Sequence, residues 1–241
     1  MPKLIFEKVF KGNLICSKPD SYNQPPTPAK KFLPHWIKQI DNQNKTSIKK
    51  CPPVIDYLIS GYCILSPATY NFKRQVIDGE EEITVDGDIF MTLDMTEAEG
   101  APSWTQIQTI SKHEFHQAPL EINNIRKSIF KIYTYWLIKP PQGYSLVYLP
   151  LNLHFLPFEI LPAIVDADDK WLAPPSFPAM CSFNDNETYE WTINAGDPIA
   201  RVIPIKREEW SSSEENNLDK QFYEGHEHGE YKEWHVKKKY D

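Results

Sequence analysis

Two aspartates and two arginines stand at the ends of apolar runs, where side chains of their type could do chemistry. Asp166 and Asp168 follow the aliphatic pair Ile164-Val165, and Arg201 and Arg207 lie within and just after a later apolar run. A carboxylate can activate water or hold Mg2+, and a guanidinium can bind phosphate through parallel hydrogen bonds. These residue types would suit the hydrolysis of a phosphate compound.

The stretch from residue 140 to 205 would position these groups. It reads as successive apolar strands joined by turns, with the aspartates at one turn and Gly196-Asp197-Pro198 at another. Short apolar runs bounded by Pro, Gly and Asp are typical of buried strands. The sequence therefore predicts a β core near residues 120–210.

The composition favours a mainly β protein. The 241 residues include 21 prolines, only 9 glycines and 13% aromatic residues, which suits short strands and extended connections better than a helical bundle. The net charge of -7 argues against a general binder of DNA or RNA, so we expect no nucleic-acid partner. No apolar run reaches the roughly 20 residues that span a bilayer, and the four cysteines lack paired spacing. We expect a cytoplasmic protein with no membrane partner.

Shifts in composition divide the chain into three predicted parts. Residues 1–119 predict an N-terminal arm, short helices and β-hairpins that pack on the core. Residues 120–210 form the β core, and residues 211–241 form a polar C-terminal tail. The tail composition is too polar to bury a core of its own.

Local signals predict several elements within these parts. Pro34 predicts the start of a short helix, and Pro52-Pro53 predict a second helix that ends at Gly61 in the left-handed conformation. Asp78-Gly79 and Asp86-Gly87 predict two hairpin turns. Residues 130–138 predict one long strand that pairs antiparallel with residues 144–149.

Histidine pairs raise the question of a metal site. His113 and His116, or His226 and His228, could each supply two ligands, whereas structural zinc normally has four. No Cys or carboxylate stands at a diagnostic spacing from them. We expect no metal site.

Three short motifs from Gly143 onward resemble the dUTPase and dCTP deaminase superfamily. They are Pro141-Gln142-Gly143 entering a strand, Ile164 to Asp168, and Gly196-Asp197 followed by Ile199-Ala200. The resemblance implies a β-clip fold, a compact set of short strands that commonly assembles as a trimer. It also implies that Asp166 stands where the family has a water-activating aspartate.

The chain departs from that superfamily where phosphate would be bound. The family motif Pro-Arg-Ser-Gly aligns with Pro150, Leu151, Asn152 and Leu153, which supply no charge for a phosphate clamp. The family tyrosine that backs the sugar falls on Asp169, two residues before Trp171, and the usual glutamine is Arg201. Asn152, Trp171, Arg201 and Arg207 are therefore the candidate ligand-binding residues, and Asp166 and Asp168 are catalytic only if the enzyme alternative holds.

A second resemblance covers most of the chain. Segments such as Leu33-Pro34-His35-Trp36, Gly61-Tyr62 and Gly196 to Ala200 are similar to a functionally unassigned family of phage- and bacteria-encoded proteins. If a phage encodes the chain, its location is the cytoplasm of the host cell.

Three functions follow from these observations. The leading hypothesis is a non-catalytic binding or assembly protein on a degenerate dUTPase-like scaffold, with no cofactor, a trimer as the preferred state and a host or phage protein as a further partner. One alternative is a divergent nucleotide hydrolase or deaminase of the dUTP or dCTP type, which would need Mg2+. Another is a structural protein of a virus particle.

Overall fold

The computed structural model describes residues 2–9, 14–15, 24–40, 47–78, 80–94, 104–112, 128–154, 156, 158–168, 175–181 and 189–214. This part of the chain is mainly β, and every strand pair in it is antiparallel. The prediction of a mainly β fold is confirmed. Among the described residues, none of the helices is both long and apolar enough to span a membrane.

A five-stranded sheet carries the predicted site. Its order is β14 (Ala163–Val165), β12 (Tyr144–Leu149), β17 (Pro198–Lys206), β4 (Tyr62–Leu65) and β3 (Thr27–Pro28). β17 thus lies between β12, from the second half of the chain, and β4, from the first half. The sheet joins the predicted residues 1–119 and 120–210 through the contact of β4 with β17.

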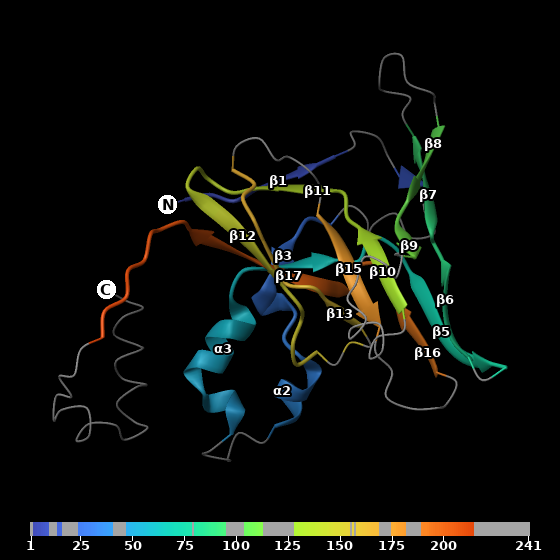
Figure 1. Cartoon of the computed structure of the whole chain (residues 1–241), viewed down its shortest axis with the longest axis horizontal. Coiled ribbons are helices and arrows are strands. Elements are labelled where there is room, and N and C mark those ends of the chain that lie inside the picture. The colour runs from blue at the N-terminus through green and yellow to red at the C-terminus, as the bar shows by residue number, and fades with distance from the viewer. Residues whose placement is uncertain are drawn as a thin grey trace.

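Within the described ranges, four smaller sheets lie around it (Figure 1). One has the order β13 (Phe158–Ile160), β15 (Ser176–Cys181), β10 (Ser128–Tyr133) and β9 (Ile110–Lys112). Another has β16 (Tyr189–Ile193), β5 (Tyr70–Ile77) and β6 (Glu80–Gly87). The remaining two are β2 (Leu14–Ile15), β7 (Phe90–Asp94) and β8 (Trp104–Gln108), and the pair β1 (Ile5–Lys8) and β11 (Trp136–Lys139).

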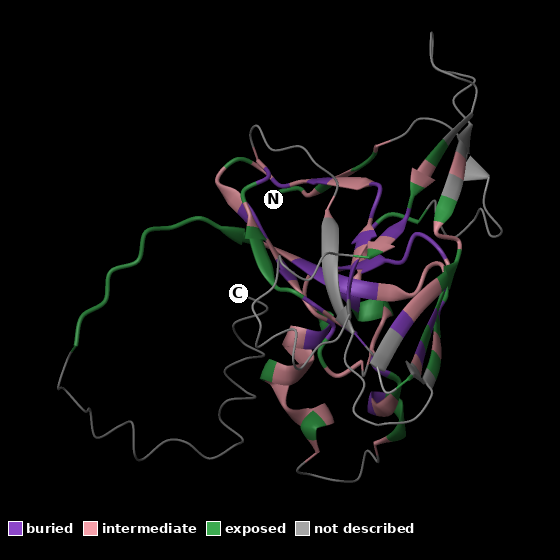
Figure 2. Ribbon diagram, turned by 45° about the vertical axis from the view of Figure 1, so that its right-hand side comes forward, coloured by how far each residue is buried: buried purple, intermediate pink, exposed green. Residues whose placement is uncertain are grey.

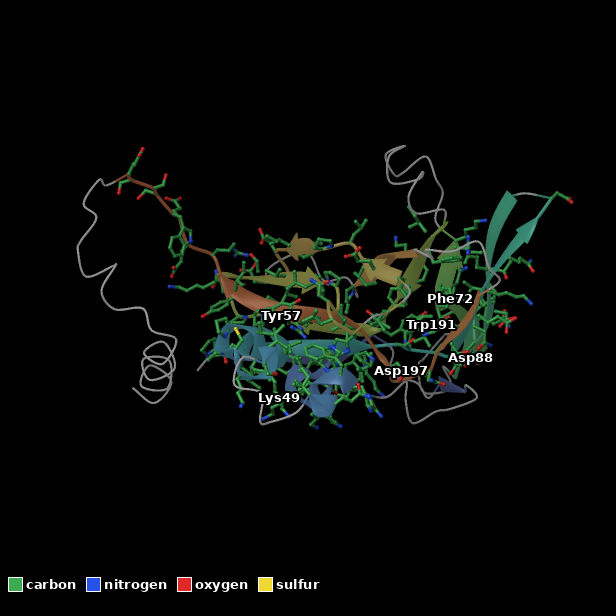
Figure 3. All side chains as sticks on the ribbon, turned by 90° about the horizontal axis from the view of Figure 1, so that it is seen from below. Lys49, Tyr57, Phe72, Asp88, Trp191 and Asp197 are labelled. Atoms are coloured by element: carbon green, nitrogen blue, oxygen red, sulfur yellow. The ribbon has the colours of Figure 1, made fainter. Side chains whose placement is uncertain are left out.

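The main apolar core lies between these sheets. Phe72 of β5 and Trp191 of β16 lie side by side in it (Figure 3), with ring centroids 5.7 Å apart. Buried members from the five-stranded sheet include Ile64, Leu146, Tyr148, Ala200 and Val202. Burial of such aliphatic and aromatic side chains is the main force that holds antiparallel sheets together.

Short helices cover the other face of the five-stranded sheet. They are the 3-10 turns η1 (Ala29–Lys31) and η2 (Ile48–Lys50) and the α-helices α2 (His35–Gln39) and α3 (Pro52–Ile59). Both predicted helices are present, and Gly61 has the predicted left-handed conformation with φ +70°. A second, smaller core of Ala29, Cys63, Leu65 and Leu151 lies under them. Most residues of α3 are intermediate in burial, whereas three of the five residues of α2 are exposed, and each helix has one buried residue, Leu58 in α3 and Ile37 in α2 (Figure 2). Such mixed burial is expected for helices that pack on a sheet through one side.

Two predictions about the strands were wrong. The long strand over residues 130–138 is divided into β10 and β11, because Thr134 leaves the sheet and donates its N–H and Oγ–H to the carbonyl of Pro175. Neither half pairs with β12, whose partners are β14 and β17.

The second predicted hairpin is also absent. β5 and β6 form the first hairpin, but β6 and β7 belong to different sheets. After Gly87, the N–H of Asp88 donates to the carbonyl of Thr69, and the chain then turns away toward β8.

Candidate functional site

The two predicted carboxylates and Arg207 meet at one end of the five-stranded sheet. β14 and β17 both run antiparallel to β12, so their carboxyl ends lie together beside the first residue of β12. Asp166 and Asp168 follow β14 directly, and Arg207 follows β17. We call these three residues the carboxylate corner.

Asp168 is fully paired within this corner. Its carboxylate accepts hydrogen bonds from both terminal nitrogens of Arg207, one of them Nη1 to Oδ1 at 3.1 Å. Oδ2 also accepts the main-chain N–H of Gly143 at 2.7 Å. The Asp168 side chain is only 5% exposed. Its contacts are those of a structural ion pair that joins the turn before β12 to the end of β17.

Asp166 is the more accessible of the two aspartates. Its side chain is 66% exposed, and Oδ1 accepts the hydroxyl hydrogen of Ser145 at 2.5 Å. Oδ1 also lies 3.3 Å from Nη1 of Arg207, which in turn donates to the carbonyl of Tyr144 at 3.2 Å. Arg207 therefore spans both aspartates and the start of β12.

The pairing controls the charge of the corner. The Arg207 hydrogen bonds, with a smaller contribution from the N–H of Gly143, lower the pKa of Asp168 from 3.8 to about 2. The same pairing raises the pKa of Arg207. Since the pKa of Asp168 is lowered by folding, its ionised form stabilises the fold above about pH 3.8, and this contribution is lost as the pH falls toward 2.

Substitution of Arg207 by glutamine is expected to release Asp168. The pKa of Asp168 should rise from about 2 toward its ordinary value of 3.8, because the largest cause of the lowering is removed. An NMR titration of the Asp168 carboxyl carbon measures this. The neighbouring substitution Lys206→Gln removes an exposed charge that pairs with Glu208, and it should leave the titration unchanged. An unchanged titration in Arg207→Gln would contradict the assigned ion pair.

Arg201 lies away from the corner, in the interior. It is 1% exposed and stands opposite Cys63 on β4. Its guanidinium donates to the carbonyls of Tyr57 and Leu58 and lies over the Tyr57 ring, 4.6 Å from the centroid. Figure 3 shows Tyr57 on α3 close to β17. Both carbonyls belong to the last turn of α3, where the Tyr57 carbonyl also accepts the N–H of Ser60 at 3.4 Å. The contacts of Arg201 are therefore those of a helix cap.

The other two candidate ligand-binding residues are not gathered here either. Asn152 is exposed in the turn that follows β12, where Leu151 packs into the smaller core. Leu153 has φ +71°, and its carbonyl accepts the indole N–H of Trp36 at 2.7 Å. Trp171 lies outside the described residues, as do all four histidines considered for a metal. Among the residues that are described, no cluster of three or more His, Cys, Asp or Glu could hold a metal ion.

His154, in the same turn, is a titratable group close to Arg201. Its Nε2 atom is buried and has no hydrogen-bond partner. Burial, and secondly the positive charge of Arg201, lower the pKa of His154 below 6.5. The fold therefore favours neutral His154.

Stability is expected to fall in mild acid for this reason. The contribution of His154 is complete above pH 6.5 and is lost progressively as the pH falls below it, because the unfolded chain binds the proton more tightly. Urea unfolding of the wild type at pH 7.5 and 5.5, compared with His154→Gln, measures the effect. The wild type should lose more stability than the variant, and equal losses would show that His154 does not titrate differently in the fold.

Two parts of the site were not predicted. The hydroxyl of Ser145 on β12 and the main-chain N–H of Gly143, in the turn before it, bind the aspartates from 21 to 25 residues earlier in the chain. The second is the buried position of Arg201, which could have been predicted. On a strand, Arg201 points to the same face as Ile199 and Ile203, and an apolar face of this kind must be covered.

Comparisons with known proteins give two similar structures. No protein-family model and no curated protein sequence matches the chain. The dUTPase of Staphylococcus bacteriophage 80alpha, as an aspartate-to-asparagine mutant with dUpNHpp, is 10% identical with a TM-score of 0.38, and the match covers 90% of this chain and 98% of that one. A glycine-to-serine mutant of the same dUTPase with dUpNHpp is 11% identical with a TM-score of 0.36, over 91% of this chain and 93% of that one. With TM-scores of 0.38 and 0.36, these matches assign neither a fold family to the chain nor a role to any side chain. The resemblances to the dUTPase superfamily and to the unassigned family stay predictions.

Proposed function

We propose that this chain is a non-catalytic binding or assembly protein built on a dUTPase-like scaffold. It would work as a homo-oligomer, with a trimer as the expected state and a host or phage protein as a further partner. The observation that carries this proposal is the pairing of Arg207 with both aspartates of the carboxylate corner.

The pairing removes the charges that a phosphate site would need. Asp168 is covered, and the guanidinium of Arg207 is already bound on its hydrogen-bonding side by carboxylates. A phosphate would have to displace a bidentate ion pair, next to the exposed carboxylate of Asp166, which repels it. The corner thus favours a structural role.

The buried position of Arg201 supports the same proposal. Its terminal nitrogens are held by the last turn of α3, so the guanidinium cannot turn toward a ligand without uncapping the helix. Neither arginine in the enzyme hypothesis is therefore free to grip phosphate.

Melting temperatures and pyrophosphate release test the proposal. The wild type is measured alone and with dUTP, dCTP and other deoxynucleotides in the presence of Mg2+. We expect no increase in melting temperature and no pyrophosphate. A nucleotide that raises the melting temperature by several degrees and releases pyrophosphate, with loss of release in Asp166→Asn, would establish the hydrolase alternative instead.

A further inference from the structure

The two edges of the five-stranded sheet differ in their protection. β3, at one edge, is two residues long, half-buried, and ends in Pro28, which has no N–H to offer. β14, at the other edge, has exposed Ala163 and Ile164. Natural sheets usually block such edges with charges, prolines or a covering segment, because an open edge pairs with other strands. In the part of the chain that the structure describes, β14 has none of these blocks from Ala163 to Val165.

An apolar strip extends from this edge across the sheet. Ile164 stands opposite Val147, and Val147 stands opposite Ile203, so the three side chains point to the same face. Ile205, two residues further along β17, shares that face and is exposed. Ile164 itself is 68% exposed. The edge therefore offers both main-chain groups and apolar side chains to a partner.

We propose that β14 pairs antiparallel with β14 of a second copy, across a two-fold axis at Ile164. In this arrangement Ile164 of one copy stands opposite Ile164 of the other, and Ala163 of each copy stands opposite Val165 of the other. Each apolar residue therefore meets an apolar residue. Asp166 would stand opposite Pro162, which has no N–H to leave unpaired. Asp166 and Asp168 are both paired with Arg207 within each chain, so the contact leaves neither carboxylate without its cation.

The choice of a second copy follows from this self-complementarity. In an antiparallel pair across a two-fold axis, a strand lies beside a second copy of itself that runs in the opposite direction. β14 suits such a pair because its centre is apolar and a proline precedes it. The contact would join the five-stranded sheets of two copies into one sheet of ten strands. A two-fold contact doubles any assembly, so a monomer becomes a dimer and a trimer becomes a hexamer.

The inference deepens the proposed assembly role, and it rests on that role. The two can fail separately. Nucleotide hydrolysis would overturn the proposed function whatever the mass of the protein, whereas the experiments below address only the pairing of β14.

Light scattering of the full chain, over a range of concentrations, is the first test. Ile164→Lys places a charge on the open edge, and the 68% exposure of the side chain allows the longer residue to be accommodated. Phe90→Lys is the matched control, because Phe90 is 59% exposed on β7 in a different sheet. Because this contact would join two of the proposed trimers, we expect a hexamer in the wild type and in Phe90→Lys, and a trimer in Ile164→Lys. An unchanged mass in Ile164→Lys, or a monomeric wild type, overturns the proposal.

Oxidative cross-linking tests the register directly. Directly opposed residues of an antiparallel pair have Cα atoms about 4.5–5.5 Å apart, which a disulfide can bridge. Ile164→Cys should form a cross-linked pair of chains under mild oxidation, and Phe90→Cys and the wild type should not. A protein that has an even number of copies by light scattering, but does not cross-link in Ile164→Cys, would overturn pairing about this residue.

Discussion

Gly61→Ala is expected to lower the free energy of unfolding by about 3 kcal/mol or more. Gly61 has φ +70° after α3, and a Cβ there would lie 2.2 Å from the carbonyl oxygen of Val202 and 2.8 Å from the Cγ1 of Ile203. The clash with Val202 is with main chain in the centre of the sheet, so a side-chain rotation cannot relieve it. Either α3 or β17 would have to move. Urea unfolding of wild type and variant measures the loss.

Gly143→Ala is the matched control for this change. Gly143 has a similar left-handed conformation, with φ +82°, but nothing lies within 4 Å of its added Cβ. Only the conformational strain remains, which is about 1 kcal/mol for a non-glycine residue. If the free energy of unfolding fell equally in the two variants, backbone strain alone would explain why position 61 requires glycine. The close contact of α3 with β17 would then play no part.

Arg201→Met is expected to destabilise the protein by about 3 kcal/mol. The substitution keeps the apolar stem of the side chain but leaves the carbonyl of Leu58 buried without its donor, and removes the contact with the Tyr57 ring. Each lost hydrogen bond from a charged donor costs about 1.5–3 kcal/mol, and relief from burying a charge offsets part of the sum.

Lys206→Met separates this effect from a general loss of positive charge. Lys206 lies on the same strand, β17, but its side chain is exposed and, among the described residues, pairs with Glu208. Its loss should change stability by less than about 0.5 kcal/mol. If Arg201→Met were as stable as Lys206→Met, the cost of burying the Arg201 charge would equal the free energy gained from its hydrogen bonds. The cap of α3 would then add nothing to the stability of the protein.

The elements that the sequence predicted well are those set by local chemistry. Pro52 can begin a helix because its missing N–H is not needed there, and Gly61 can end one because it tolerates a positive φ. α3 and β4 follow these signals closely. The first hairpin turn likewise depends on neighbouring residues alone, with Asp78 at φ +53°.

The pairing of strands depended on contacts that no local signal records. Residues 130–138 have a continuous strand-forming sequence, but Thr134 finds a better hydrogen-bond partner in Pro175, and the chain changes sheets at that point. Similarly, Asp86-Gly87 has a turn sequence, but Gly87 lies so close to Thr69 that the chain bends there without reversing.

The sequence named Asp166, Asp168 and Arg207 as candidates but could not predict their contacts. Only under the hydrolase alternative were the two aspartates expected to be catalytic, with an arginine on the phosphate. The three residues lie together, but whether they bind a ligand stays a prediction. Their proximity comes from the shared neighbour β12, which places the ends of β14 and β17 side by side. Sequence could not show that the three residues would pair with one another.

Calorimetric titration with dUpNHpp and Mg2+ tests the central claim most directly, which is that the carboxylate corner is structural. The analogue is not hydrolysed, so binding is measured apart from any reaction. We predict no binding heat in the wild type, because Arg207 and both aspartates already satisfy one another. Saturable binding that is lost in Arg207→Gln and retained in Lys206→Gln would contradict the account and identify the corner as a nucleotide site.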